Sequence, residues 1–61
     1  MTLEEAIKTA IQYETKIRDV YRAAAQKVSE TAGKSFLKTM AEDEQRHLDY
    51  LLDRLEQELA G

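Results

Sequence analysis

The sequence contains no cysteine and no proline, and only two glycines among its 61 residues. Without cysteine these residues form neither disulfides nor thiolate metal sites, including the rubredoxin type, so any metal site must use carboxylates and histidine. Most of the residues present are Ala, Glu, Lys, Leu, Arg and Gln, which favour helices. The composition therefore predicts a single all-α domain, too small to bury a large core without a partner.

Charge and hydropathy exclude two further classes of protein. The net charge is −3, and nine Lys and Arg are scattered among twelve acids without a basic stripe, so we expect no nucleic-acid partner. No apolar run approaches the roughly 18 residues of a membrane span, so we expect no membrane contact. The acidic start, MTLEEAIK, lacks the basic and apolar blocks of a secretion signal. The expected location is therefore the cytoplasm or a compartment inside it.

Apolar residues recur in two helical stripes, which predict one helix over about 2–28 and another over about 31–59. Thr2 is a good N-cap for the first helix, and Glu5, three residues later, completes a capping box. The second stripe is wide, which is typical of a helix that meets more than one neighbour. The first stripe comprises Leu3, Ile7, Ala10, Ile17, Tyr21, Ala24 and Val28; the second comprises Leu37, Met40, Leu51 and Leu55, widened by Phe36, Leu48, Leu52 and Leu59.

The turn between the helices has two candidate positions. Gly33 is suited to end the first helix, whereas Ser29 is suited to cap the second. If position 14 lies level with positions 44 and 47 in an antiparallel hairpin, the turn falls near residue 30. This condition favours a turn over about 29–31, with Gly33 inside the first turn of the second helix.

A two-helix hairpin leaves one long apolar face uncovered. Two copies that pack against each other close this face as an antiparallel four-helix bundle, and a two-fold homodimer is the commonest way to do so. We therefore interpret residues 1–61 as a half-domain that dimerises. The wide apolar face of the second helix leaves a higher oligomer open.

Three ionisable residues, Glu14, Glu44 and His47, interrupt the apolar stripes. A buried charge costs several kcal/mol unless it is paired or binds a metal. Residues three apart on a helix point the same way, so Glu44 and His47 can hold one metal ion together. A Glu-x-x-His motif from two helices and a Glu from each of two others is the ligand set of di-iron bundles. A homodimer supplies this set, and its four carboxylates balance two divalent cations.

The same ligand set also accepts manganese or zinc, so the pattern does not fix the metal. Asp43, one turn before His47, is a candidate acceptor for the imidazole N–H, and Tyr21, seven residues after Glu14, is a candidate neighbour of the site. The alternative is a structural hairpin without metal, used for protein interaction. In it Glu44 and His47 form an intrahelical pair and Glu14 sets the helix register.

The segments AIQYETKIRDVYRAAAQKV and SFLKTMAEDEQRHLDYLL resemble the rubrerythrin branch of the ferritin-like superfamily. They share a Glu followed seven residues later by Tyr, and an Ala-x-x-Glu-x-x-His motif. With only two helices, the chain is similar to encapsulated ferritins, which dimerise around a di-iron site. The resemblance implies that Glu14, Glu44 and His47 are the iron ligands and catalytic residues, with Tyr21 beside them.

The resemblance also implies a function. It predicts a ferroxidase that oxidises Fe(II) for iron storage or detoxification, with rubrerythrin-like peroxide reduction as the alternative. Encapsulated ferritins reach an encapsulin shell through a C-terminal tail. This sequence ends at Gly61 without one, so an encapsulin partner is expected only through a tail that is not present here.

Overall fold

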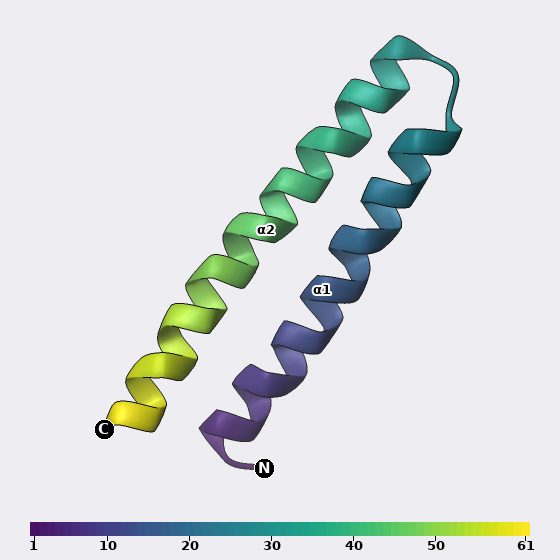
Figure 1. The fold of residues 1–61 in the computed structure, drawn as a ribbon. Coiled ribbons are helices and arrows are strands. Elements are labelled where there is room, and N and C mark those ends of the chain that lie inside the picture. Colours follow the sequence, from purple (N-terminus) through teal and green to yellow (C-terminus); the bar gives the residue numbers. More distant parts are fainter.

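The chain forms two helices, α1 (Leu3–Lys27) and α2 (Thr31–Ala60), in a computed structural model that describes all 61 residues. The helices run antiparallel and side by side, with both chain ends at the same end of the hairpin (Figure 1). The molecule is a slab of 46 × 17 × 11 Å. The prediction of an all-α two-helix hairpin is confirmed.

Helix α1 begins with the predicted capping box. The Glu5 backbone N–H donates to the Thr2 hydroxyl at 3.1 Å, and the Thr2 backbone N–H donates to a Glu5 carboxylate oxygen at 2.9 Å. These two bonds satisfy amides that have no partner inside the helix. Lys8 adds an ion pair with Glu4 at 2.9 Å. The chain therefore starts the helix at a defined residue, which sets the level of every later side chain on α1.

The capping box makes the pH dependence of this helix end testable. The hydrogen bond from the Thr2 backbone, followed by the Thr2 side chain, holds the pKa of Glu5 below its usual value. Because the folded pKa is the lower one, this stabilisation is complete above the usual pKa and is lost as the pH falls through the folded value. We expect Thr2→Ala to move the Glu5 pKa upward, as measured by NMR titration of its carboxyl carbon. An unchanged Glu5 pKa, equal to that in the control Thr39→Ala, would contradict the contribution of the Thr2 side chain.

Three residues, 28–30, connect the helices. Val28 and Glu30 both have extended backbones, and Glu30 is the N-cap of α2 without a side-chain hydrogen bond. The prediction that Ser29 caps α2 is wrong, because α2 begins one residue too late for Ser29 to be its cap. The connection is instead held by Lys34, whose ammonium donates to the Ala25 carbonyl at 2.9 Å. This bond satisfies one of the last carbonyls of α1 and ties it to α2.

Gly33 lies inside the first turn of α2 and does not end α1. It has an ordinary helical backbone rather than a positive φ. A β-carbon added there would meet Val28 Cγ2 at 3.6 Å and Glu30 Cβ at 3.7 Å, which are normal van der Waals distances. We therefore expect Gly33→Ala to stabilise the fold by about 0.5–1 kcal/mol, because alanine loses less backbone entropy. Urea unfolding measures this gain, and a lower midpoint for the variant would contradict it.

The core of the hairpin is thin. Four side chains are buried, with exposed fractions of 2% for Leu48 and 6% for the others: Ile7, Ala25 and Ala41. Leu48 is therefore the most enclosed side chain of the molecule. Neither helix contains an apolar stretch long enough to cross a membrane.

The predicted stripe on α1 is only partly buried. Ala25 is buried where Ala24 was predicted, and Leu3 and Ile17 remain 52% and 39% exposed. On α2, exposed apolar side chains include Phe36, at 61%. The physical reason is that each helix has a single neighbour and turns only one edge of its stripe toward it. The other edge remains exposed.

Candidate metal centre

Glu14 on α1 and Glu44 and His47 on α2 come together in the middle of the hairpin. Their ligand atoms all lie within 4.8 Å of one another. His47 Nδ1 is 3.4 Å from Glu44 Oε2 and 3.7 Å from Glu14 Oε2. The turn at 28–30 produces this arrangement, because an antiparallel chain reversed there places residue 14 level with residues near 45. One turn of α2 then carries both Glu44 and His47 on the side of Glu14.

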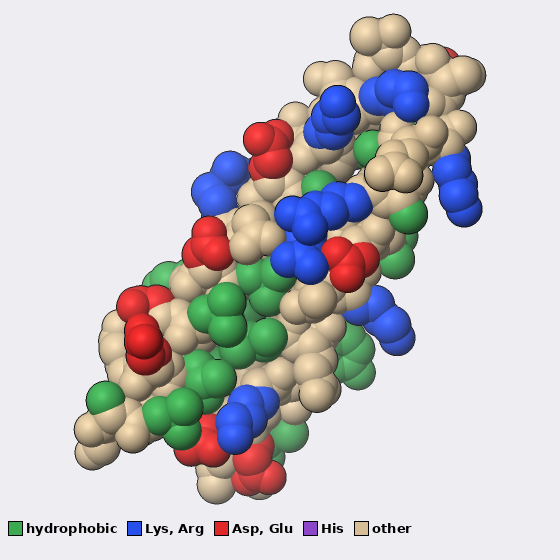
Figure 2. All heavy atoms as spheres, viewed as in Figure 1, with side chains coloured by type: hydrophobic (Ala, Val, Ile, Leu, Met, Phe, Trp, Pro, Cys, Tyr) green, Lys and Arg blue, Asp and Glu red, His purple; other side chains and the backbone are tan.

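The three side chains differ in burial. The Glu44 and Glu14 side chains are 13% and 28% exposed, whereas that of His47 is 58% exposed. The carboxylates therefore lie in the seam between the helices, and the imidazole stands at its open side. The group opens onto one broad face of the hairpin. Figure 2 shows the opposite face, on which no histidine is visible.

One oxygen of Glu14 has no partner. Glu14 Oε2 is buried and forms no hydrogen bond, and it is the only side-chain atom of the molecule in this state. The 3.7 Å to His47 is too long for a hydrogen bond. Buried carboxylate oxygens are normally hydrogen-bonded or bound to a metal. Two carboxylates and an imidazole fit a divalent transition-metal ion, which would give this oxygen its missing partner.

No hydrogen bond or ion pair joins the group to either of its two predicted neighbours, Asp43 and Tyr21. Asp43 forms an ion pair with Arg46 on the exposed side of α2, and no hydrogen bond joins it to His47. The predicted contact is not made because the Asp43 carboxylate is paired with Arg46 instead. Tyr21 is half-buried and lies two helical turns from Glu14, about 10 Å along α1. Its role beside the site stays a prediction.

Arg18 joins the two helices through Gln45, a contact that was not predicted from the sequence. Its Nη1 donates to Gln45 Oε1 at 2.8 Å, across the two helices. Its Nε and Nη2 donate to Asp19 Oδ1 at 3.1 and 2.9 Å, and the side chain is only 19% exposed. Arg18 follows Glu14 by one turn, and Gln45 is adjacent to Glu44. This bond therefore joins the two helices close to the level of the two carboxylates, and no signal in the sequence indicated it.

The fold and the three side chains define a helical hairpin with a carboxylate–histidine group, as in ferritin-like proteins. The family model for rubrerythrin matches residues 1–58, so the chain belongs to the rubrerythrin family. The predicted family is thus confirmed, whereas the likeness to encapsulated ferritins stays a prediction. No curated protein and no solved structure matches the chain. The family typically binds iron, and this chain carries a Glu/Glu/His group able to hold a metal.

Proposed function

We propose that the chain binds Fe(II) through Glu14, Glu44 and His47 and promotes its oxidation, as a ferroxidase in iron storage or detoxification. The observation that carries this proposal is the buried, unpartnered Glu14 oxygen beside the Glu44 and His47 ligand atoms. A structural hairpin has no need for an orphaned carboxylate at its centre, because an apolar residue there would cost less. The rubrerythrin family match supports iron as the metal.

We further propose that the site is completed by a second copy of the chain. One chain offers three ligand groups, and His47 is more than half exposed on the open face. Ile17, one turn from Glu14, is 39% exposed, and Tyr50, one turn from His47, is 70% exposed. A two-fold partner on this face would cover these apolar side chains and contribute a second set of ligands. The resulting four carboxylates and two imidazoles would balance two Fe(II) ions.

The residues of the chain have distinct tasks in this reaction. The carboxylates of Glu14 and Glu44 attract Fe(III) more strongly than Fe(II), because the charge of the ion rises, and they therefore favour its oxidation. His47 adds a neutral nitrogen donor on the open side. Bound iron supplies the electrons: two Fe(II) give one each, and dioxygen accepts two electrons and two protons to form hydrogen peroxide. Peroxide can serve as the oxidant in turn, which connects ferroxidation with rubrerythrin-like peroxide reduction.

A kinetic experiment tests the proposed function. Fe(II) is added to the metal-free protein without oxygen, air is then admitted, and near-ultraviolet absorbance reports the formation of Fe(III). We expect stoichiometric uptake and oxidation faster than in protein-free buffer. A parallel reaction with hydrogen peroxide replaces dioxygen, and a faster rate there would favour peroxide reduction as the main activity. Absence of Fe(II) uptake would contradict both and favour the structural hairpin.

A further inference from the structure

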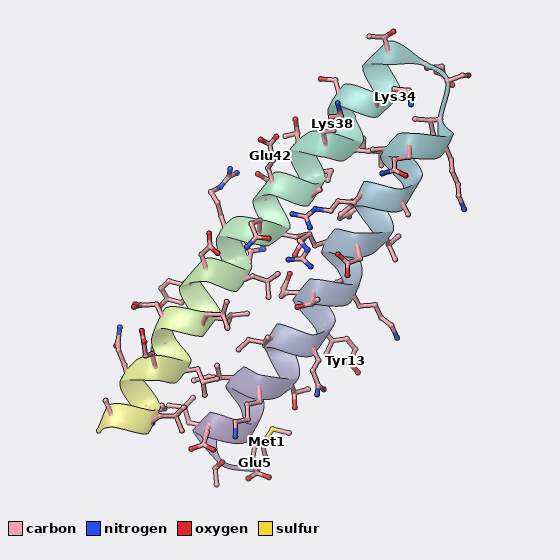
Figure 3. The ribbon with its side chains drawn as sticks, viewed as in Figure 1. Met1, Glu5, Tyr13, Lys34, Lys38 and Glu42 are labelled. Atoms are coloured by element: carbon pink, nitrogen blue, oxygen red, sulfur yellow. The ribbon has the colours of Figure 1, made fainter.

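The face opposite the metal group has unpaired charges of opposite sign at its two ends. Toward the turn, Arg22, Lys34 and Lys38 have no carboxylate within ion-pair distance, whereas toward the chain ends Asp49 and Asp53 have no cation. Glu56 is unpaired as well. Lys34 and Lys38 lie on the turn-side half of α2 on this face (Figure 3). The face is therefore polarised along its length, although the chain as a whole is only mildly acidic.

The two ends of this face also differ in shape. At the turn side, the small buried residues Ala25 and Ala41 leave a hollow of about 600 Å³, whose rim carries three cations, Arg22, Lys34 and Lys38, and one acid, Glu42. At the other end, the side chains of Leu52 and Leu59 stand out, with exposed fractions of 50% and 62%. Figure 2 shows basic side chains over the turn-side half and hydrophobic ones gathered over the other half. One end is hollow and basic, and the other is raised, apolar and acidic.

We infer that this face binds a second copy of itself, with the two α2 helices antiparallel about a two-fold axis level with Gln45. Such an axis places Lys34, eleven residues before Gln45, opposite Glu56, eleven residues after it. It places Lys38 opposite Leu52 and within one residue of Asp53. Unpaired cations of each copy thus meet unpaired acids of the other.

The axis also matches the shapes of the two ends. Leu52 of each copy lies opposite Lys38 of the other, one turn from Ala41, and both of these residues border the hollow. An exposed leucine thus meets a space lined by alanines and by the aliphatic stems of lysines, as a knob meets a hole. At the axis itself, Arg18 and Arg22 both donate to Gln45, at 2.8 and 3.5 Å. The positive charges of these arginines offset the negative charges of Glu42 and Asp49, which the axis brings near each other.

The size of the face is sufficient for a specific interface. With extents of 46 and 17 Å, it presents roughly 800 Å², which is the area that each partner typically buries in a stable complex. The metal group opens on the opposite side, so both faces can be occupied together. A chain with two isologous faces builds assemblies of at least four copies.

A charge exchange tests this interface. Sedimentation velocity at low salt should show species of four or more chains for the wild type. Lys38→Glu and Asp53→Lys should each lower the association constant of this step about 10-fold or more, and the double variant should restore it to within about 3-fold. Leu52→Glu should abolish the step while leaving the circular dichroism spectrum unchanged, since Leu52 is half exposed. Lys16→Glu, an exposed change outside this face, is the control.

The outcomes separate this inference from the proposed function. If the metal face does not dimerise, the wild type stops at two chains, and the single variants become monomers that the double variant rescues. Fe(II) uptake should be unchanged in every variant, because none touches the metal group. A wild type that never exceeds the metal-face dimer, or single variants that associate normally, would overturn the inference. So would a double variant that associates no better than either single one.

Discussion

Replacing Glu44 by alanine should abolish stoichiometric iron uptake and, with it, the accelerated oxidation of Fe(II). Glu44 is the least exposed of the three ligand groups, and it lies 3.4 Å from His47. Its loss removes one of the two carboxylates that each chain offers, so two negative charges would disappear from the proposed dimer site. Loss of residues that merely orient metal ligands costs 10- to 100-fold in affinity, so loss of a ligand should cost on the order of 100-fold or more. Anaerobic Fe(II) titration measures the change.

The matched control for this variant is Glu42→Ala. Glu42 is an exposed glutamate on the same helix, two residues away on the opposite face (Figure 3). It should bind and oxidise iron as the wild type does, which excludes a general effect of removing an acid from α2. Iron uptake by Glu44→Ala equal to that of Glu42→Ala would remove Glu44 from the site. The expected effect on folding is small for both variants, since neither glutamate belongs to the apolar core.

Replacing Leu48 by alanine should have the largest effect on stability. Leu48 is only 2% exposed, the lowest fraction in the molecule, and it is one of just four buried residues. Truncation of a buried leucine typically costs about 2–5 kcal/mol, through lost burial and the cavity that remains. A domain of this size has a total stability of the same order, so much of the population should unfold. Urea unfolding of the metal-free protein, followed by circular dichroism, measures this loss.

The matched control for Leu48 is Leu59→Ala. Leu59 lies on the same helix but is 62% exposed, so its truncation should change the unfolding free energy by less than about 0.5 kcal/mol. Leu48 also lies one turn after Glu44 and next to His47. Its truncation should therefore weaken iron binding indirectly, and excess Fe(II) should recover part of the lost stability by mass action. Equal destabilisation by the two variants would mean that the helices do not pack through Leu48.

Much of this fold was predictable because its determinants are local. The capping box of Thr2 and Glu5 depends on residues three apart, and it forms as predicted. The turn near residue 30 was predicted from helix rise, on the condition that Glu14 lies level with Glu44 and His47. The prediction was sound because two long helices joined by three residues have few other ways to pack.

The predictions of burial that were wrong share one physical cause, which is the number of helices that each helix packs against. Periodicity shows which side of a helix is apolar, but not which edge of that side meets the partner. For this reason Ala25 replaced Ala24 in the core, and Ile17 remained exposed. The bond from Arg18 to Gln45 joins residues 27 apart, and nothing in either local sequence demands it. Ser29 was preferred as a cap for its side chain, whereas the backbone starts α2 after Glu30.

The most direct test of the shared metal site is whether iron binding and dimerisation are coupled. Lys38→Glu is used as the background, so that association through the opposite face does not contribute. Sedimentation equilibrium of this variant is measured without oxygen at increasing Fe(II). We predict that the dimer dissociation constant falls as Fe(II) rises, with two irons bound per two chains, and that adding Glu44→Ala removes the effect. A monomer that binds iron as tightly as the dimer does would contradict the shared site.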